Sequence, residues 1–408
     1  MTETPTTEAL PTDFPAVRPS GCPFDPATGY AALRGHQRIA KVATPVGVDA
    51  WVFSRYDEVR KVLADPRLSS RVAPSTHVVP GADLEREVES GSILQSDGER
   101  HAYLRRLLTS EFTVKRVQAL RPRIQELVEE HIDALLAHEG PVDLVQAFAL
   151  PIPSLVICEL LGVPYADRAE FQERSAVLVS VDKPEDEVMR VNEELGEYMA
   201  GLVQRKQAVR EDDLLSRLIT RSEEQEQPLT IEELVSIGIT LLIAGHETTA
   251  NMIALSTLAL LRTPEQLDAL RDDPALAKPA IEELLRYLSV VQFGVFRQVM
   301  EDIPFGDETI QAGDYLIAAL SSGNRDERAF PDPDQLDLTR KASAHLAFGF
   351  GPHQCLGQQL AGVELYEVYT RLYRRIPTLR LAIPFEDVEF KDNTLVYGVK
   401  ALPVTWDR

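Results

Sequence analysis

The sequence is poor in cysteine, and the few cysteines it has are placed in a way that excludes several classes of protein. Cys22, Cys158 and Cys355 are the only cysteines among 408 residues. They form no CxxC pair and no spacing typical of zinc ligands, and an odd number so far apart does not supply a disulfide framework. A reducing cytoplasm is therefore the expected location of the protein.

The sequence also lacks an excess of positive charge. It carries 42 Lys and Arg residues against 64 Asp and Glu residues, which gives a net charge of −22. Because phosphate groups repel a protein of this charge, we expect neither a nucleic acid nor an anionic membrane surface as its main partner.

No hydrophobic leader is visible at the N-terminus. Residues 1–20 are rich in Thr and Pro and have no apolar core, so we interpret them as an N-terminal arm and not as a signal peptide or membrane anchor. Length alone suggests two or three domains. However, no Gly/Ser-rich linker or Pro-rich hinge interrupts the interior of the sequence, which is compatible with one large domain.

Helical periodicity dominates the sequence, and β-rich runs are confined to its two ends. A β-hairpin is predicted at 39–47 and 49–53, small sheets are predicted after residue 290, and a long functional or mobile loop is predicted at 71–95. Helices are expected through most of 101–208 and at about 56–64, 231–262, 277–288 and 356–376, followed by a strand at 395–406. The predicted fold class is therefore mainly α with minor β.

Cys355 lies in a glycine-rich stretch, FGFGPHQCLGQQLA at 348–361. Apolar residues three to four positions apart follow it and place it at the N-terminus of a helix, where backbone N–H groups favour a thiolate. Gly351 and Gly357 would allow the close approach of a flat, bulky group such as a metal macrocycle. A buried structural cysteine is the alternative interpretation of a lone cysteine.

Three competing motifs are excluded. The glycine spacing around Cys355 is not GxGxxG and no GK[ST] is present, so this stretch is not a phosphate loop. No CxxCH motif is present, which excludes a haem attached covalently through that motif. The pair that begins at His246 lacks the second histidine of the zinc motif HExxH, because Ala250 stands in its place.

A long apolar segment at 231–262 contains an acid and an alcohol at its centre. As a helix it would span about 48 Å, enough to cross a whole domain. A transmembrane span is disfavoured because HETTAN, at 246–251, interrupts the apolar run. Thr248 can hydrogen-bond the carbonyl of Ala244 and open the helix, so that Glu247 and Thr248 hold water and relay protons. The alternative is a core threonine beside a glutamate that reaches solvent.

Two further pairs of residues have helical spacing. Glu283 and Arg286 lie three residues apart on an otherwise apolar helix, which favours a buried ion pair over a surface pair. His101 and Arg105 lie one turn apart and are suited to binding a carboxylate, although a solvated basic helix face explains them equally well.

Together these motifs resemble those of the cytochromes P450, the haem-thiolate monooxygenases, and specifically the soluble bacterial type of actinomycetes. FGFGPHQCLG fits the haem-binding signature FxxGxxxCxG, AGHETT fits the oxygen-activating helix, and ELLR at 283–286 fits the ExxR pair. Arg340 resembles the third member of the Glu–Arg–Arg cluster of that family. The resemblance covers nearly the whole chain. It implies a large helical region and a small β-rich region around a buried haem, with residues 21–408 as a single domain.

The resemblance also implies roles for individual residues. Cys355 would be the axial thiolate ligand of the iron in a non-covalently bound haem b, and Glu247 and Thr248 would deliver protons during oxygen activation. The residues implied in cofactor binding are Cys355, Phe348, Gly351, Gly357, Ala244 and four propionate-binding groups, His101, Arg105, Arg297 and His353. Those implied in substrate binding are Leu241, Ala244, Val291, Gly294, Val295 and Val396. Because the latter set is apolar, a bulky hydrophobic substrate such as a polyketide, macrolide or steroid is expected, with ordinary core residues as the alternative.

The resulting hypothesis is a monooxygenase that inserts one oxygen atom from O2 by hydroxylation or epoxidation. Electrons would come from a separate ferredoxin and ferredoxin reductase, because the sequence leaves no room for a fused redox domain. Arg105, Arg106, Lys115 and Arg116, with the surface near His353, would form the docking patch. The alternatives are a haem-thiolate peroxygenase or dehydratase, which would not need the proton relay, and a haem carrier or gas sensor without catalysis.

Overall fold

The structure is a computed structural model that describes residues 12–15, 18–19, 22–36, 39–72, 78 and 92–407. The expected arm at 1–20 and the expected loop at 71–95 lie mostly outside these residues. The described part of the arm is attached to a strand, because the backbone N–H of the buried Phe14 donates to the carbonyl of Ala43 over 2.9 Å. The division of the chain into an arm and one domain stays a prediction.

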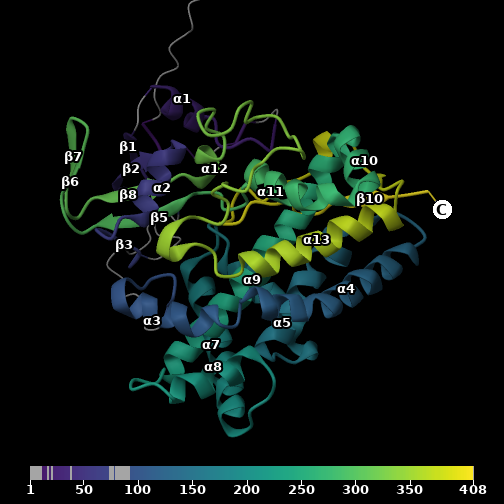
Figure 1. Ribbon diagram of the computed structural model, residues 1–408, viewed down its shortest axis with the longest axis horizontal. Helices are drawn as coiled ribbons and strands as arrows, with labels where there is room; N and C mark the ends of the chain where they lie inside the picture. Colours follow the sequence, from purple (N-terminus) through teal and green to yellow (C-terminus); the bar gives the residue numbers. More distant parts are fainter. Residues whose placement is uncertain are drawn as a thin grey trace, which may run out of the picture.

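The helical part of the molecule is built around α9 (Ile231–Arg262), which runs through its centre (Figure 1). This helix begins where the sequence predicts, because Thr230 and Glu233 form a capping box. The Thr230 hydroxyl accepts the N–H of Glu233, and the Glu233 carboxylate accepts the N–H of Thr230. Two neighbouring helices, α5 (Pro151–Leu161) and α7 (Glu185–Ala208), pack against α9.

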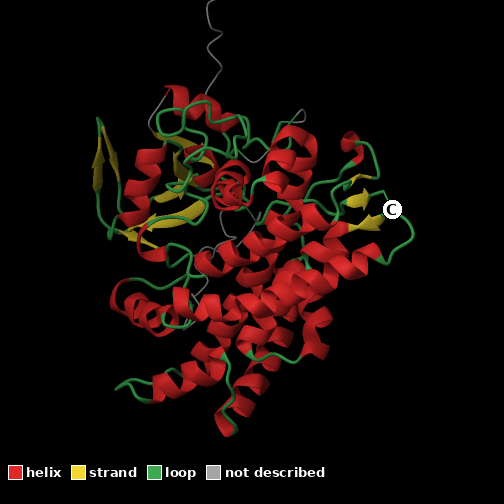
Figure 2. Cartoon of the chain, turned by 45° about the vertical axis from the view of Figure 1, so that its right-hand side comes forward, coloured by secondary structure: helices red, strands yellow, loops and turns green. Residues whose placement is uncertain are grey.

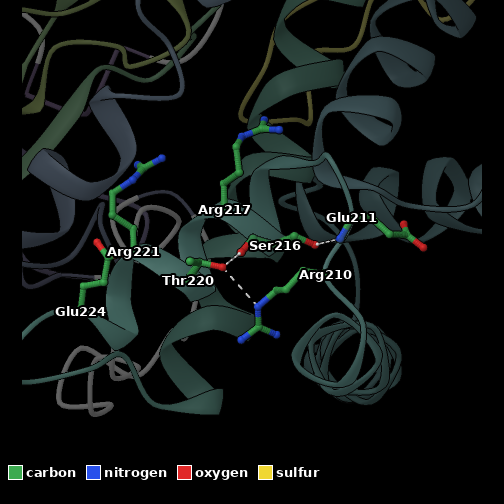
Figure 3. Close-up of a pocket in the computed structure, with 7 residues that line it drawn as sticks. All are labelled: Arg210, Glu211, Ser216, Arg217, Thr220, Arg221 and Glu224. Atoms are coloured by element: carbon green, nitrogen blue, oxygen red, sulfur yellow. Dashed lines mark hydrogen bonds between the residues drawn. The ribbon is translucent and has the colours of Figure 1, made fainter.

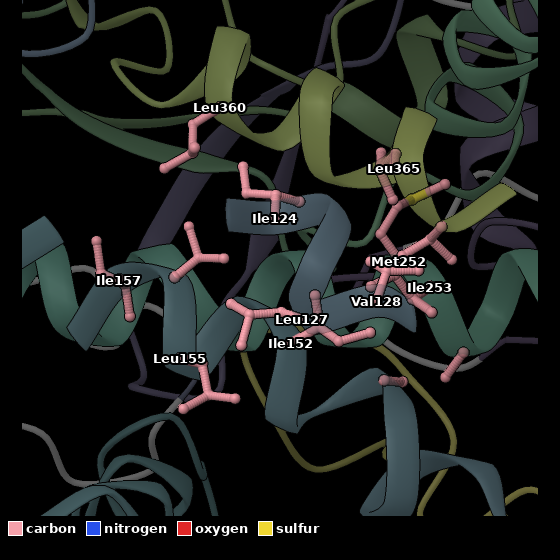
Figure 4. Close-up of a cluster of buried hydrophobic side chains, with 14 of the residues drawn as sticks. Ile124, Leu127, Val128, Ile152, Leu155, Ile157, Met252, Ile253, Leu360 and Leu365 are labelled. Carbon is pink, nitrogen blue, oxygen red and sulfur yellow. The ribbon is translucent and has the colours of Figure 1, made fainter. Parts of the chain in front are cut away.

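The core is completed by α4 (Val114–Leu136) and α13 (Gln358–Arg375), which lie side by side. Figure 4 shows where apolar side chains of α4, α5, α9 and α13 meet, among them Ile124, Leu127, Val128, Ile152, Leu155, Ile157, Met252, Ile253, Leu360 and Leu365. These labelled side chains are at most 5% exposed. Burying one of them stabilises the fold by about 1.5–3 kcal/mol, so packing fixes the position of α9.

The remaining helices surround this core. They are α1 (Gly29–His36), α2 (Tyr56–Ala64), α3 (Gly98–Thr109), α6 (Arg168–Leu178), α8 (Leu214–Glu223), α10 (Pro264–Asp272), α11 (Ala277–Leu288) and α12 (Leu320–Gly323). Short turns of other helix types occur at Val145–Ala149, Tyr165–Asp167, Pro274–Leu276, Gly351–His353 and Phe385–Asp387. None of the helices in the described ranges is both long and apolar enough to cross a membrane.

The largest sheet among the described residues has the strand order β1-β2-β8-β5-β3. The expected hairpin is confirmed, because β1 (Ile39–Ala43) and β2 (Asp49–Phe53) pair antiparallel with Ile39 opposite Phe53. The other strands of this sheet are β8 (Tyr315–Ala318), β5 (Val295–Val299) and β3 (Leu68–Ser69). The parallel pairing of β2 with β8 joins the two ends of the sequence in one sheet.

Two smaller sheets lie apart from the large one. One has the order β4-β10-β9 and consists of β4 (Val142–Asp143), β10 (Pro403–Thr405) and β9 (Arg380–Leu381); the other pairs β6 (Ile303–Phe305) with β7 (Glu308–Ile310). Figure 2 shows the strands gathered on two sides of the helices, which confirms a mainly α fold with minor β.

The last helix, expected at about 356–376, is confirmed as α13, which begins at Gln358 with Gly357 at its cap position. The expected strand at the end of the sequence is wrong in its extent. The expected tail strand at 395–406 is limited to β10 and single bridges such as Val291–Val396. The reason is a turn, since the N–H of Lys391 donates to the carbonyl of Gly398 over 2.8 Å and bends the chain back on itself.

Candidate active site around Cys355

A tight loop presents Cys355 just before α13. The N–H of Cys355 donates to the carbonyl of Phe348 over 2.8 Å, which closes the loop on itself. The expected reason for Gly351 needs a correction. Its φ is +77°, and a Cβ there would lie 2.7 Å from the backbone oxygen of Leu63, so this glycine admits helix α2 and not a bound group. By contrast, nothing lies within 4 Å of a Cβ built on Gly357, which leaves open space beside the cysteine.

The electrostatics of the Cys355 sulfur combine two opposed effects. Burial raises the pKa of the Cys355 thiol, while hydrogen bonds from the backbone N–H groups of Gly357 and Gln358 and the nearby charge of Arg105 act to lower it. A coordinated metal ion deprotonates a thiol outright. The loop therefore offers donors and a cation that stabilise a thiolate once a metal is bound to it.

Four cationic or hydrogen-bonding side chains predicted to bind propionates come together from three segments. His101 and Arg105 lie on α3, Arg297 lies on β5, and His353 lies in the cysteine loop. The imidazole rings of His101 and His353 stack with centroids 3.9 Å apart. An acidic group is close to them, since Oδ1 of Asp97 lies 3.9 Å from Nε2 of His353.

Burial and neighbouring positive charges act on the two histidines of this cluster and lower the pKa of each. Burial, followed by the neighbouring charges of His101 and Arg297, lowers the pKa of His353 to about 3. Burial lowers the pKa of Arg297 to about 10, although the charge of Asp97 acts to raise it. In addition, Nε2 of His101 is buried without a hydrogen-bond partner in the described part of the chain. A cluster with this charge and an unpartnered nitrogen fits the two carboxylates of a haem, so the residues present are suited to the group that the sequence motifs imply.

One turn near the middle of helix α9, from Ala244 to Thr248, is less covered by other parts of the protein than the rest of the helix. Ala244 is exposed and Thr248 is half-buried, although the residues on either side of this turn are largely buried. The hydroxyl of Thr248 donates to the carbonyl of Ala244 over 2.8 Å, as the sequence predicts. The turn from 244 to 248 therefore presents a free face with a hydroxyl on it.

Glu247, next to this free face, is buried and held by several polar groups. Its Oε2 accepts a hydrogen bond from Nδ2 of Asn251 over 3.2 Å and lies 3.9 Å from Nζ of Lys391. Its Oε1 lies 3.5 Å from Nε2 of His246. Burial raises the pKa of the Glu247 carboxyl, but His246, Lys391 and Asn251 together outweigh it, so the pKa is lowered overall. Glu247 is therefore a buried carboxylate. The alternative interpretation, a core threonine beside a glutamate that reaches solvent, does not fit this burial.

The residues predicted to bind substrate lie on three segments. Val291 and Val396 are brought together by an antiparallel bridge, and Val295 begins β5. Gly294 has a φ of +78°, and a Cβ there would lie 2.6 Å from the carbonyl oxygen of Ala318, so its role is to let β5 approach β8. Leu241 lies on α9 one turn before Ala244 and is 8% exposed.

The expected buried pair in ELLR is confirmed. Glu283 and Arg286 are both 0% exposed, with Nε of Arg286 donating to Oε2 of Glu283 over 2.7 Å. Nε of Arg340 donates to Oε1 of Glu283 over 3.1 Å, which completes the predicted three-residue cluster. Arg286 also donates to the backbone carbonyls of Asn324 and Pro333, so the cluster fixes the chain that leads into the cysteine loop.

Comparison with known proteins identifies the chain. The cytochrome P450 family model matches residues 173–401. The chain is also 46% identical over 393 residues to cytochrome P450-SU2 of Streptomyces griseolus, and 96% of each protein is covered. The chain belongs to the cytochrome P450 family.

Solved structures of other P450s have the same fold. CYP105P1 in complex with filipin I matches with a TM-score of 0.93 at 42% identity, covering 97% of this chain and 99% of that chain. The mycinamicin VIII C21 methyl hydroxylase MycCI from Micromonospora griseorubida, bound to mycinamicin VIII, matches with a TM-score of 0.86 at 39% identity over 94% of this chain and 98% of that chain. This P450 is a monooxygenase of the actinomycete type, and the family implies a haem-thiolate cofactor.

The sequence analysis did not identify three residues that determine the surroundings of the Glu247 carboxylate. Asn251 lies one turn after Glu247, and this i, i+4 spacing was a signal that could have found it. Lys391 and Gly398 come from a loop far along the chain, and nothing local marks them. A Cβ on Gly398 would lie 1.8 Å from Oδ1 of Asn251, so only glycine lets this loop reach Asn251.

A hollow of about 230 Å3 lies between the end of α7 and α8, and none of the predicted site residues lines it (Figure 3). Three arginines line it, but carboxylates of the protein neutralise them. Arg210 pairs with Glu223, and Arg217 and Arg221 both pair with the buried Glu111. Its cations are thus satisfied within the P450 and do not require an external anion.

Proposed function

We propose that this P450 inserts one oxygen atom from O2 into a bulky hydrophobic small molecule, by hydroxylation or epoxidation. The observation that carries the proposal is the turn of α9 in which Thr248, whose hydroxyl bonds the carbonyl of Ala244, directly follows the buried Glu247. A peroxygenase or a dehydratase would not need such a pair, and a haem carrier or gas sensor would need neither the pair nor an apolar substrate site.

The chain offers a separate group for each part of the cofactor, which we take to be a non-covalently bound haem b. Cys355 would be the axial ligand, Phe348 would pack beside the thiolate, and the four propionate-binding groups would be His101, Arg105, Arg297 and His353. Bound there, a haem with a thiolate ligand supplies the reductive activation of O2 and the cleavage of the O–O bond. Gly357 and Ala244 would leave room for its two faces, because both border open space.

The residues of α9 would move protons to the reaction centre. Nζ of Lys391 is partly exposed and lies 3.9 Å from the Glu247 carboxylate, so this carboxylate has a charged group between itself and solvent. We infer that Glu247 receives protons on this side at Oε2 and passes them to the hydroxyl of Thr248. The hydroxyl of Thr248 donates its one proton to the carbonyl of Ala244 at rest, so to relay a proton it would turn from this carbonyl, donate that proton toward the reaction centre and take one back from Glu247.

The substrate class follows from the apolar residues around the exposed turn. Leu241, Ala244, Val291, Gly294, Val295 and Val396 carry no charge and no hydrogen-bonding side chain. Such a surface favours a ligand that buries apolar area. The related structures bound to filipin I and to mycinamicin VIII support a large natural product as the substrate of this chain.

Electrons would come from a separate ferredoxin and ferredoxin reductase. Arg105 is half-buried, so we leave it out of the proposed docking patch. Arg106, Lys115 and Arg116 are exposed and remain as the basic patch for an acidic ferredoxin. A reducing cytoplasm is the proposed location, since the ligand thiol must stay reduced to bind iron.

An isotope experiment tests the proposed reaction. The protein, supplied with ferredoxin, reductase and a panel of large hydrophobic natural products, is incubated under 18O2. We expect a product that contains one 18O atom, and none when the label is in water or in added hydrogen peroxide. Product formed only from labelled peroxide would overturn the proposal in favour of a peroxygenase, and spin-state changes without any product would favour a carrier.

Charge reversal tests the electron donor. Lys115→Glu should slow reduction by ferredoxin at low salt, and the difference should fade as salt screens the patch. Reduction by dithionite should be unchanged, because it does not need protein docking. Equal ferredoxin rates for the variant and the wild type would show that this patch is not the docking site.

A further inference from the structure

His345, ten residues before Cys355, is a buried histidine to which the proposed reaction gives no role. It is 8% exposed, and its ring centroid lies 5.5 Å from that of Phe348. Its Nδ1 accepts a hydrogen bond from the backbone N–H of Ala347 over 3.1 Å. A ring nitrogen that accepts a hydrogen bond carries no proton, so in the neutral ring the proton is on Nε2.

The other side of the ring faces an acid. Nε2 of His345 lies 3.4 Å from Oε2 of Glu282, which is on α11 with its side chain 39% exposed. The two are close without forming a hydrogen bond, so the influence of Glu282 on the ring is electrostatic. Both residues line a hollow of about 700 Å3 that also borders Phe348 and Gln354 of the cysteine loop. A carboxylate at this distance favours the tautomer with the proton on Nε2, and this tautomer leaves Nδ1 free to accept from Ala347.

Backbone hydrogen bonds link His345 to the loop that carries the Cys355 sulfur. Ala347 is held by His345, and the next residue, Phe348, accepts the N–H of Cys355 at its carbonyl over 2.8 Å. A series of contacts thus runs from a carboxylate in the hollow to the residue that bears the thiolate. Hydrogen bonds that orient a metal ligand influence both its retention and the potential of the metal.

We propose that His345 is a positioning residue for the thiolate loop, and that Glu282 holds its imidazole in the tautomer this task requires. The inference rests on the proposed role of Cys355 as the axial ligand. Loss of the acceptor at Nδ1 would release the N–H of Ala347, loosen the loop and weaken the sulfur–iron bond. A weaker thiolate donates less electron density to iron, which favours the reduced state.

Three variants test this proposal by their spectra and potentials. His345→Phe keeps a ring but removes the acceptor. His345→Asn restores an acceptor, because an asparagine side-chain oxygen can bond the N–H two residues later. Glu282→Gln keeps the shape of the acid but can donate to Nε2, which favours the wrong tautomer. His131→Phe, a change to a histidine of α4 whose ring bonds Leu127 in the same helix, is the matched control.

We measure the midpoint potential and the rate at which the carbon monoxide complex loses its red-shifted Soret band. His345→Phe should lose the band at least threefold faster than the wild type and have a higher potential, while His345→Asn and His131→Phe should match the wild type. Glu282→Gln should change in the same direction as His345→Phe by a smaller factor. If His345→Phe does not fold, the comparison of Glu282→Gln with the wild type decides.

Two results would overturn the inference. One is a folded His345→Phe, or failing that Glu282→Gln, with the potential and band lifetime of the wild type. The other is a folded His345→Asn that is as impaired as His345→Phe, since the acceptor would then be irrelevant. Absence of the red-shifted band in the wild type itself is a separate result, which contradicts the proposed role of Cys355 and not the role of His345.

Discussion

Replacement of Gly398 by alanine tests whether the C-terminal loop holds Glu247, the proposed proton donor, in place. A Cβ at this position would lie 1.8 Å from Oδ1 and 2.5 Å from Cγ of Asn251, far inside van der Waals contact. Asn251 is buried and its side chain is short, so a change of side-chain rotamer cannot relieve this clash. The added methyl group must therefore displace the amide that donates to Glu247 over 3.2 Å.

The size of the effect follows from the hydrogen bond that is lost. A hydrogen bond to a charged group contributes about 1.5–3 kcal/mol. If this contribution holds Glu247 in the geometry for proton transfer, product formation should fall by about 10- to 100-fold. Substrate binding should change much less, because neither Gly398 nor Asn251 is among the residues proposed to contact the substrate.

The assay compares product formed with electrons consumed. We expect Gly398→Ala to form less product per electron pair and to release more hydrogen peroxide, and Asn251→Ala to show the same defect. Gly196→Ala on α7 is the control, because nothing lies within 4 Å of its added Cβ. Wild-type coupling in a folded Gly398→Ala variant, or in Asn251→Ala, would refute the reasoning.

Three further predictions concern charges. Folding lowers the pKa of Glu247, so the stability that this carboxylate contributes is fully present above its ordinary pKa of 4.5 and is lost as the pH falls through the lowered pKa. The difference in unfolding free energy between the wild type and Glu247→Gln should therefore shrink on acidification. A difference that stays constant with pH would contradict this prediction. Arg286→Met leaves the buried Glu283 without its main partner and should cost about 3–5 kcal/mol in denaturant unfolding; a loss below about 1 kcal/mol would contradict a buried pair. Arg297→Leu should release haem to an acceptor protein about 10- to 100-fold faster, whereas Arg67→Leu, at an exposed pair, should not.

Much of the site could be predicted because its parts are local in sequence. Spacing within one helix placed Thr248 opposite the carbonyl of Ala244 and put Glu283 beside Arg286. The capping box fixed the start of α9. In each case the backbone geometry of a helix determines which residues meet, so a sequence pattern is sufficient.

The remaining parts depend on contacts between distant segments. The approach of Gly398 to Asn251 joins a C-terminal loop to the centre of α9, and no periodicity encodes it. For the same reason the constraint on Gly351 comes from the backbone of α2, and the half-burial of Arg105 could not be predicted from its spacing to His101. The sequence therefore does not predict those contacts that depend on how distant helices, strands and loops pack together.

The central claim is that the sulfur of Cys355 binds the haem iron, and the spectrum of the reduced protein under carbon monoxide tests it most directly. The wild type should show a strongly red-shifted Soret band, and Cys355→Ser should bind haem without that band. A wild-type spectrum without the shift, or a serine variant that retains it, would contradict the account.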